Sequence, residues 1–201
     1  MSSVFFPNIT YNPADYIKTS TGNIVSRKAL ICKPQAVELP GGRCIICDDV
    51  IIRGDLAPVQ VNKYSKIGAG TVLRPGTVMT LAAASGKEAD AAEPPTPTLR
   101  FIPMTIGSHT QIGSNSIIEA AVIGTGCVIG NNVVISPRAV LKDFVTVHDD
   151  SVICPDAVYA PFSVVSGRPA KVVCEAPESA STLATADAVR NYRSWRPNPS
   201  P

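Results

Sequence analysis

The chain has 201 residues, of which 45% are hydrophobic and only 5% aromatic, and its formal net charge at pH 7 is +2. The length suits one domain with appendages, and the small net charge without a Lys/Arg block argues against nucleic-acid binding. No apolar run reaches transmembrane length and no signal-peptide pattern is present, so we expect a cytoplasmic protein without direct membrane insertion.

The first 40 residues hold no regular period. Short apolar runs alternate with turn signals at 21–23 and 40–42. We therefore assign residues 1–40 to an N-terminal cap and an irregular first coil.

A six-residue period runs through residues 41–173 and is clearest in eight consecutive hexads from 123 to 170. Every hexad there begins with an aliphatic or aromatic residue, and Gly, Asn, Asp and Pro gather between the expected strands. One hexad supplies a short strand and a turn, and three hexads close a triangular coil, so the period predicts an all-β parallel β-helix of about seven coils. The first positions should stack inside it: Ile67, Leu73, Ile106, Ile112, Ile123, Ile129, Ile135, Leu141, Val147 and Ile153.

Two segments depart from the hexads. Residues 82–103 are rich in Ala, Pro and polar residues, which predicts an exposed excursion loop between coils. Residues 174–201 should form a C-terminal helix and tail, with an α-helix over 179–195 that ends before Pro197. Its predicted apolar face recurs every three residues, at Leu183, Ala186, Val189, Tyr192 and Trp195, and its exposed face carries Arg190, Arg193 and Arg196.

The six cysteines favour reduced core residues over disulfide bonds in a chain without an export signal. Cys44 and Cys47 have the CxxC spacing of zinc and redox sites. Because residues three apart on a strand point to opposite faces, we do not expect this pair to converge on a metal.

Several segments resemble known families. The motifs YIKTSTGN at 16–23, IIRGDL at 51–56, VLRP at 72–75 and PFSVVSG at 161–167 are similar to the dynactin subunit 5 family, over most of residues 11–173. The hexads themselves resemble the left-handed β-helix superfamily of acyltransferases and γ-class carbonic anhydrases. The resemblance implies a left-handed coil and a non-catalytic structural or adaptor subunit of the dynactin pointed-end complex.

The same resemblance implies a set of partners. These are a homologous β-helix, dynactin subunit 6, that pairs side by side with this one, together with dynactin subunit 4, an actin-related protein at the filament pointed end, and cargo adaptors. It also implies a cytoskeleton-associated protein in the cytoplasm that helps dynein–dynactin engage adaptors and endosomes.

Two enzymatic alternatives remain open. The γ-class carbonic anhydrases hold zinc with three His side chains, and the matching positions here are Arg74, Ser114 and Glu119. The first alternative is therefore a degenerate carbonic-anhydrase-like protein that forms a homotrimer. The acyltransferases commonly use a His base, and a divergent acyltransferase would need His109 or His148, both expected near turns. We expect neither catalytic residues nor a metal or cofactor.

Partner contacts are expected in three places: a flat wall of the stack, the excursion loop and the open end of the coils. Arg53 and Asp55 should order a turn between coils through charge-assisted hydrogen bonds. An Arg and an aromatic residue in the excursion are typical interface anchors. The candidate partner-binding residues are Arg53, Asp55, Arg74, Arg100 and Phe101.

Overall fold

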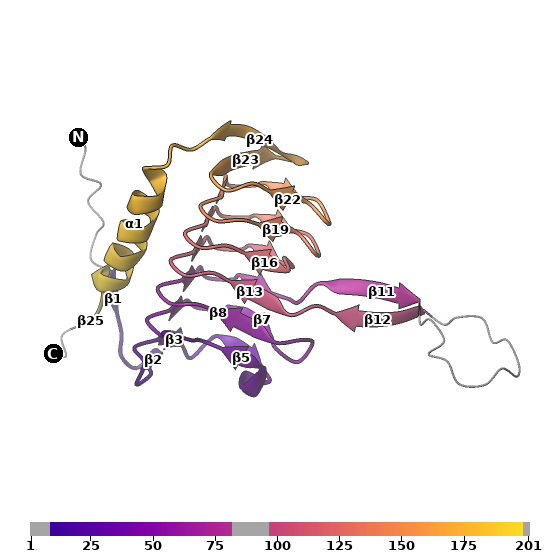
Figure 1. Cartoon of the computed structure of the whole chain (residues 1–201). Coiled ribbons are helices and arrows are strands. Elements are labelled where there is room, and N and C mark those ends of the chain that lie inside the picture. Colours follow the sequence, from indigo (N-terminus) through magenta and orange to yellow (C-terminus); the bar gives the residue numbers. More distant parts are fainter. Residues whose placement is uncertain (1–8, 82–96, 199–201) are drawn as a thin grey trace, which may run out of the picture.

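A computed structural model describes residues 9–81 and 97–198. Short strands stack into a left-handed parallel β-helix with a hairpin arm on one side and a helix on the other (Figure 1). Three parallel sheets form its walls.

Each wall takes one strand from every coil. Wall 1 consists of β3 (Ile24–Ser26), β6 (Ile45–Ile46), β9 (Lys66–Ile67), β14 (Gln111–Ile112), β17 (Val128–Ile129), β20 (Thr146–Val147) and β23 (Ser163–Gly167). Wall 2 consists of β4 (Leu30–Cys32), β7 (Ile51–Arg53), β10 (Val72–Leu73), β15 (Ile117–Ile118), β18 (Val134–Ile135) and β21 (Val152–Ile153). Wall 3 consists of β5 (Val37–Glu38), β8 (Val59–Val61), β13 (Met104–Ile106), β16 (Val122–Ile123), β19 (Val140–Leu141) and β22 (Val158–Tyr159).

The stack contains six complete coils, because walls 2 and 3 each have six strands, and wall 1 adds a seventh strand. This is one coil fewer than the hexads predict. Part of the difference lies at Thr77 and Val78, which complete a hexad in the sequence but belong to the arm in the structure. The spacing between inward residues shortens from six to five at the corner between Ile118 and Ile123, both of which are buried.

The core is the stack of first hexad positions. All ten of the side chains assigned to it, from Ile67 to Ile153, are at most 2% exposed. The fifth positions add a second buried set that includes Cys127, Val133 and Ala139. Side chains on a strand alternate between faces, so the remaining outward positions define the surface of each wall.

Both ends of wall 1 are closed by antiparallel strands. β2 (Tyr16–Lys18) pairs with β3 at the first coil, and β24 (Ala170–Glu175) pairs with β23 at the last. A short 3₁₀ helix, η1 (Pro34–Ala36), lies in the first coil. These strands cover ladder edges that would otherwise be open to pairing with another chain.

The excursion begins earlier than the composition suggests. β11 (Thr77–Leu81) and β12 (Pro97–Phe101) form an antiparallel hairpin, the arm, which leaves the corner between walls 2 and 3 (Figure 1). Most of the predicted loop, residues 82–96, lies outside the described residues. Pro97 occupies the far end of the ladder, opposite Leu81.

The C-terminal helix α1 (Ala180–Ser194) runs along the stack beside wall 1 (Figure 1). Its end differs from the prediction, because Trp195 turns to extended geometry and begins β25 (Trp195–Pro197), which pairs in parallel with β1 (Ile9–Tyr11). No helix within residues 9–81 and 97–198 is long and apolar enough to cross a membrane.

The predicted apolar face of α1 was partly wrong. Leu183 is 62% exposed and Ala186 is also exposed, whereas Ala188 is buried. An α-helix turns once in 3.6 residues, so residues spaced three apart gradually rotate around the helix axis. They therefore cannot all face the same wall of the stack. Tyr192 and Trp195 do pack on the core, and Arg190, Arg193 and Arg196 are exposed.

Candidate partner-binding surfaces

The outer face of wall 2 carries a continuous aliphatic column. Cα pairing aligns one outward residue from each coil, and two of them are well exposed, Leu30 at 57% and Ile117 at 44%. The column consists of Leu30, Ile51, Val72, Ile117, Val134 and Val152. With coils about 4.8 Å apart, it forms a straight apolar ridge of about 24 Å.

The equivalent columns on the other walls are more polar or are covered. On wall 3 the column begins with Glu38, Gln60 and Thr105 and becomes aliphatic only in the last three coils. On wall 1, α1 lies over the column, where the Asn191 amide donates to the Gln111 side chain at 2.9 Å. Wall 2 is therefore the flat, uniformly aliphatic face of the stack.

An ionic corner borders this face. Arg53 lies at the end of β7 and donates two hydrogen bonds to the Asp55 carboxylate, both at 2.8 Å. These bonds lower the pKa of Asp55 and raise that of Arg53. Arg74, one coil further along, forms an ion pair with Glu119. Each of these guanidinium groups is thus held by a carboxylate at the edge of wall 2.

The arm leaves the same corner of the coil. Phe101 pairs with Thr77 at its base, and Arg100 pairs with Val78 in the next position. Further out, Met79 is 75% exposed and its cross-strand partner Leu99 is 55% exposed. The structure therefore places the candidates from Arg53 to Phe101 along one corner, although in the described contacts they do not form a single cluster.

Sequence reasoning missed the residue that fixes the arm. Arg138 donates from Nη1 to the Thr77 carbonyl at 2.7 Å, while its Nε and Nη2 bind the Asp156 carboxylate. Arg138 also lines a cavity of about 560 Å³ at the arm base with Met79 and Leu99. In the sequence it reads only as a turn residue after Pro137, and contact across 61 positions has no local signal.

The corner between walls 3 and 1 holds a second unexpected feature, an aromatic column. Its residues share left-handed backbone geometry, with φ between 58° and 66°, and bulky L-residues adopt it at a cost of about 1–2 kcal/mol each. The column consists of Tyr64, His109, Phe144 and Phe162, and Arg43 and Gly126 occupy the same turn position in two other coils.

Contacts between the aromatic rings offset the cost of the left-handed backbone, and one of them also holds α1 against the stack. Tyr64 stacks on His109 with centroids 5.3 Å apart, and Phe144 stacks on Phe162 at 5.2 Å. Tyr192 of α1 meets Tyr64 edge-on at 5.8 Å, and its hydroxyl donates to the Gly22 carbonyl at 2.6 Å. The strained corner is therefore the docking edge for the C-terminal helix.

The two histidines have different surroundings. His109 is half-buried beneath Tyr64, and burial, assisted by the nearby Lys63, lowers its pKa. His148 is exposed on the turn after β20. His109 is held by ring stacking in the helix-docking corner.

The positions that match the zinc ligands of the carbonic anhydrases hold Arg74, Ser114 and Glu119. Arg74 and Glu119 pair with each other, and no group of three or more His, Cys, Asp or Glu side chains within 9–81 and 97–198 is arranged to hold a metal. Burial raises the pKa of both Cys44 and Cys47 to about 11, so these thiols are protonated near neutral pH. The Cys44 thiol donates to the Asn62 carbonyl at 3.1 Å, whereas a metal ligand must be a thiolate.

Comparison with known proteins shows to which family this chain belongs. The family model described as "Dynactin subunit 5" matches residues 5–198. The chain belongs to this family. A curated member, dynactin subunit 5 of Dictyostelium discoideum, is 34% identical over 110 residues, which are 55% of this chain and 48% of that relative. The chain thus aligns with about half the length of this relative.

Solved structures share the fold of this family member at low identity. AntD, an N-acyltransferase from Bacillus cereus, is 15% identical with a TM-score of 0.52, over 85% of this chain and 88% of that one. The acetyltransferase domain of PglB from Neisseria gonorrhoeae is 11% identical with a TM-score of 0.53, over 76% of this chain and 58% of that one. These likenesses concern the hexapeptide β-helix alone.

Proposed function

We propose that this protein is a non-catalytic structural subunit of dynactin that pairs, through wall 2, with the homologous β-helix of dynactin subunit 6. The observation that carries this proposal is the exposed aliphatic column from Leu30 to Val152. A regular stack of hydrogen-bonded coils is rigid, so binding to a second flat wall orders few groups and loses little conformational entropy.

The arm and the ionic corner serve further contacts in this assembly. Exposed Met79 and Leu99 give the arm an apolar surface, and Arg100 adds a charged group beside it. A two-stranded hairpin is marginally stable in water without packing on one face, which favours a partner-covered arm. We assign this side of the molecule to dynactin subunit 4, the actin-related protein of the pointed end and cargo adaptors, in a cytoplasmic, cytoskeleton-associated complex that engages endosomes.

The pairing is tested by placing one carboxylate on wall 2. Ile117→Asp should reduce the affinity for dynactin subunit 6 by at least about 100-fold, because the charge would be buried without a partner. Val158→Asp is the matched control, since Val158 is 63% exposed at the corresponding outward position of wall 3. Both variants should keep the wild-type circular dichroism and melt only a few degrees below the wild type, because both replaced side chains are partly exposed.

The measurement is co-elution and titration of the two purified subunits. Unchanged binding by the Ile117→Asp variant would remove wall 2 from the proposal, and loss of binding only in the Val158→Asp variant would move the interface to wall 3. A stable homotrimer that binds acetyl-CoA and ignores dynactin subunit 6 would instead support the acyltransferase alternative.

A further inference from the structure

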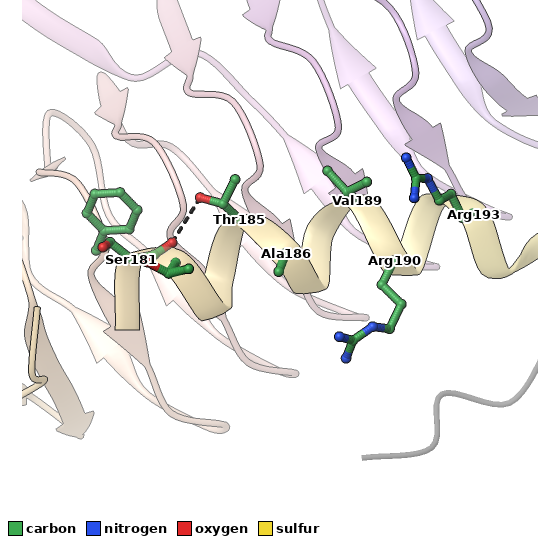
Figure 2. Close-up of a pocket in the computed structure, with 8 residues that line it drawn as sticks. Ser181, Thr185, Ala186, Val189, Arg190 and Arg193 are labelled. Carbon is green, nitrogen blue, oxygen red and sulfur yellow. Dashed lines mark hydrogen bonds between the residues drawn. The ribbon is translucent and has the colours of Figure 1, made fainter. Parts of the chain in front are cut away.

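A groove with a volume of about 770 Å³ lies beside α1 (Figure 2). Ser181, Thr185 and Val189 follow one another along it, and Arg193 lies at one end. Phe144 of the aromatic column also lines the groove. A hydrogen bond of 2.9 Å from the Thr185 hydroxyl to the Ser181 carbonyl turns that hydroxyl back onto the helix. The groove therefore presents a mainly apolar lining, in the size range of binding sites for small ligands and side chains.

The start of the described chain lies at the end of this groove. Ile9 pairs with Trp195, and Trp195 directly follows the last residue of α1. Residues 1–8 therefore join the fold about two residues beyond Arg193. Eight extended residues span at most about 26 Å, whereas the twelve helical steps from Ser181 to Arg193 cover about 18 Å. The segment is long enough to reach the whole groove.

The composition of that segment matches the lining. Val4, Phe5 and Phe6 are three consecutive apolar residues and include two of the five phenylalanines of the chain. Phe144 offers an aromatic partner and Arg193 a cation suited to a ring face. Because the segment is tethered at Ile9, its effective concentration at the groove is of millimolar order. We propose that Val4, Phe5 and Phe6 bind in the α1 groove, so that the chain covers this surface with its own N-terminal segment.

Photo-crosslinking of the full chain tests the proposal. Phe5 is replaced by p-benzoylphenylalanine, the monomer is irradiated, and tryptic peptides are analysed by mass spectrometry. The expected product joins peptide 1–18 to peptide 172–190, which carries most of α1. Mixing with isotopically heavy protein shows whether the link lies within one chain.

Two matched variants give the control. Val189→Glu places a charge in the groove and should lower the yield of this product at least about fivefold. Val173→Glu makes the same change on β24, where the side chain is 64% exposed, and should leave the yield unchanged. Equal yields in the two variants, a link that maps outside α1, or a link found only between chains would overturn the proposal.

A second measurement does not depend on the fold of the Val189→Glu variant. The Phe5→Ser/Phe6→Ser double variant uncovers the groove, so amide hydrogen exchange in α1 should become at least about threefold faster than in the wild type. Exchange at the same rate in both proteins would show that the segment does not cover α1.

Discussion

Ile117 and Ile118 are neighbours on β15 with opposite surroundings, and they give the sharpest test of the coil register. Ile118 is fully buried, whereas Ile117 is 44% exposed on wall 2. Replacing either by Ala removes three carbon groups, worth about 2.4 kcal/mol of transfer free energy when fully buried. Scaled by burial, Ile117→Ala should lower the free energy of unfolding by about 1.3 kcal/mol.

Ile118→Ala should cost more than its transfer term. The side chain stacks between Leu73 and Ile135 in the adjoining coils, and the hydrogen-bonded backbone restricts collapse around the vacated space. The cavity adds about 1 kcal/mol or more, so we expect a loss of about 3.5 kcal/mol. At about 2–4 °C per kcal/mol for a domain of this size, the melting temperature should fall by roughly 7–14 °C, against roughly 3–5 °C for Ile117→Ala.

Thermal unfolding followed by circular dichroism separates the two outcomes. The variants differ by one position on the same strand, so helix content, charge and coil number are all matched. An equal loss in both variants, or a larger loss in Ile117→Ala, would show that the register of β15 is displaced by one residue.

Other contacts give three smaller predictions. Tyr192→Phe removes the hydrogen bond to the Gly22 carbonyl and should lower the free energy of unfolding by about 1 kcal/mol, measured by chemical denaturation. Hydroxyl groups that hydrogen-bond to Asp48 lower its pKa, so its contribution to stability is present above its unfolded pKa of about 3.9 and lost as the pH falls through the folded value. Asp48→Asn should therefore be less stable than the wild type at pH 7, and melting at pH 3 should show a smaller gap. Arg138→Ala releases the Thr77 carbonyl, and hydrogen exchange in β11 should rise about fivefold while exchange in β18 stays unchanged.

The hexads determined most of the fold. An inward aliphatic residue every six positions can be buried only if coils stack, so the period alone specified the β-helix and its core from Ile67 to Ile153. The excursion and the C-terminal helix also followed from composition, because Pro-rich and Gly-free segments have opposite local preferences. Within the described residues, the start of the arm at Thr77 and the end of the helix at Ser194 depended on pairing partners far away in sequence.

Tertiary structure alone decided which surfaces are available. The outward position before each first hexad residue is aliphatic on several strands, and nothing local distinguishes Val128, beside α1, from Ile117, on the open wall. Wall 1 is covered and wall 2 is open because α1 docks on wall 1, through the ring contact of Tyr192 with Tyr64 and the hydrogen bond from the Tyr192 hydroxyl. Left-handed geometry recurs at one turn position of every hexad from Gly126 to Phe162. Only the tertiary structure explains the large rings at two of these positions, because Phe144 and Phe162 stack on each other at the corner where α1 docks.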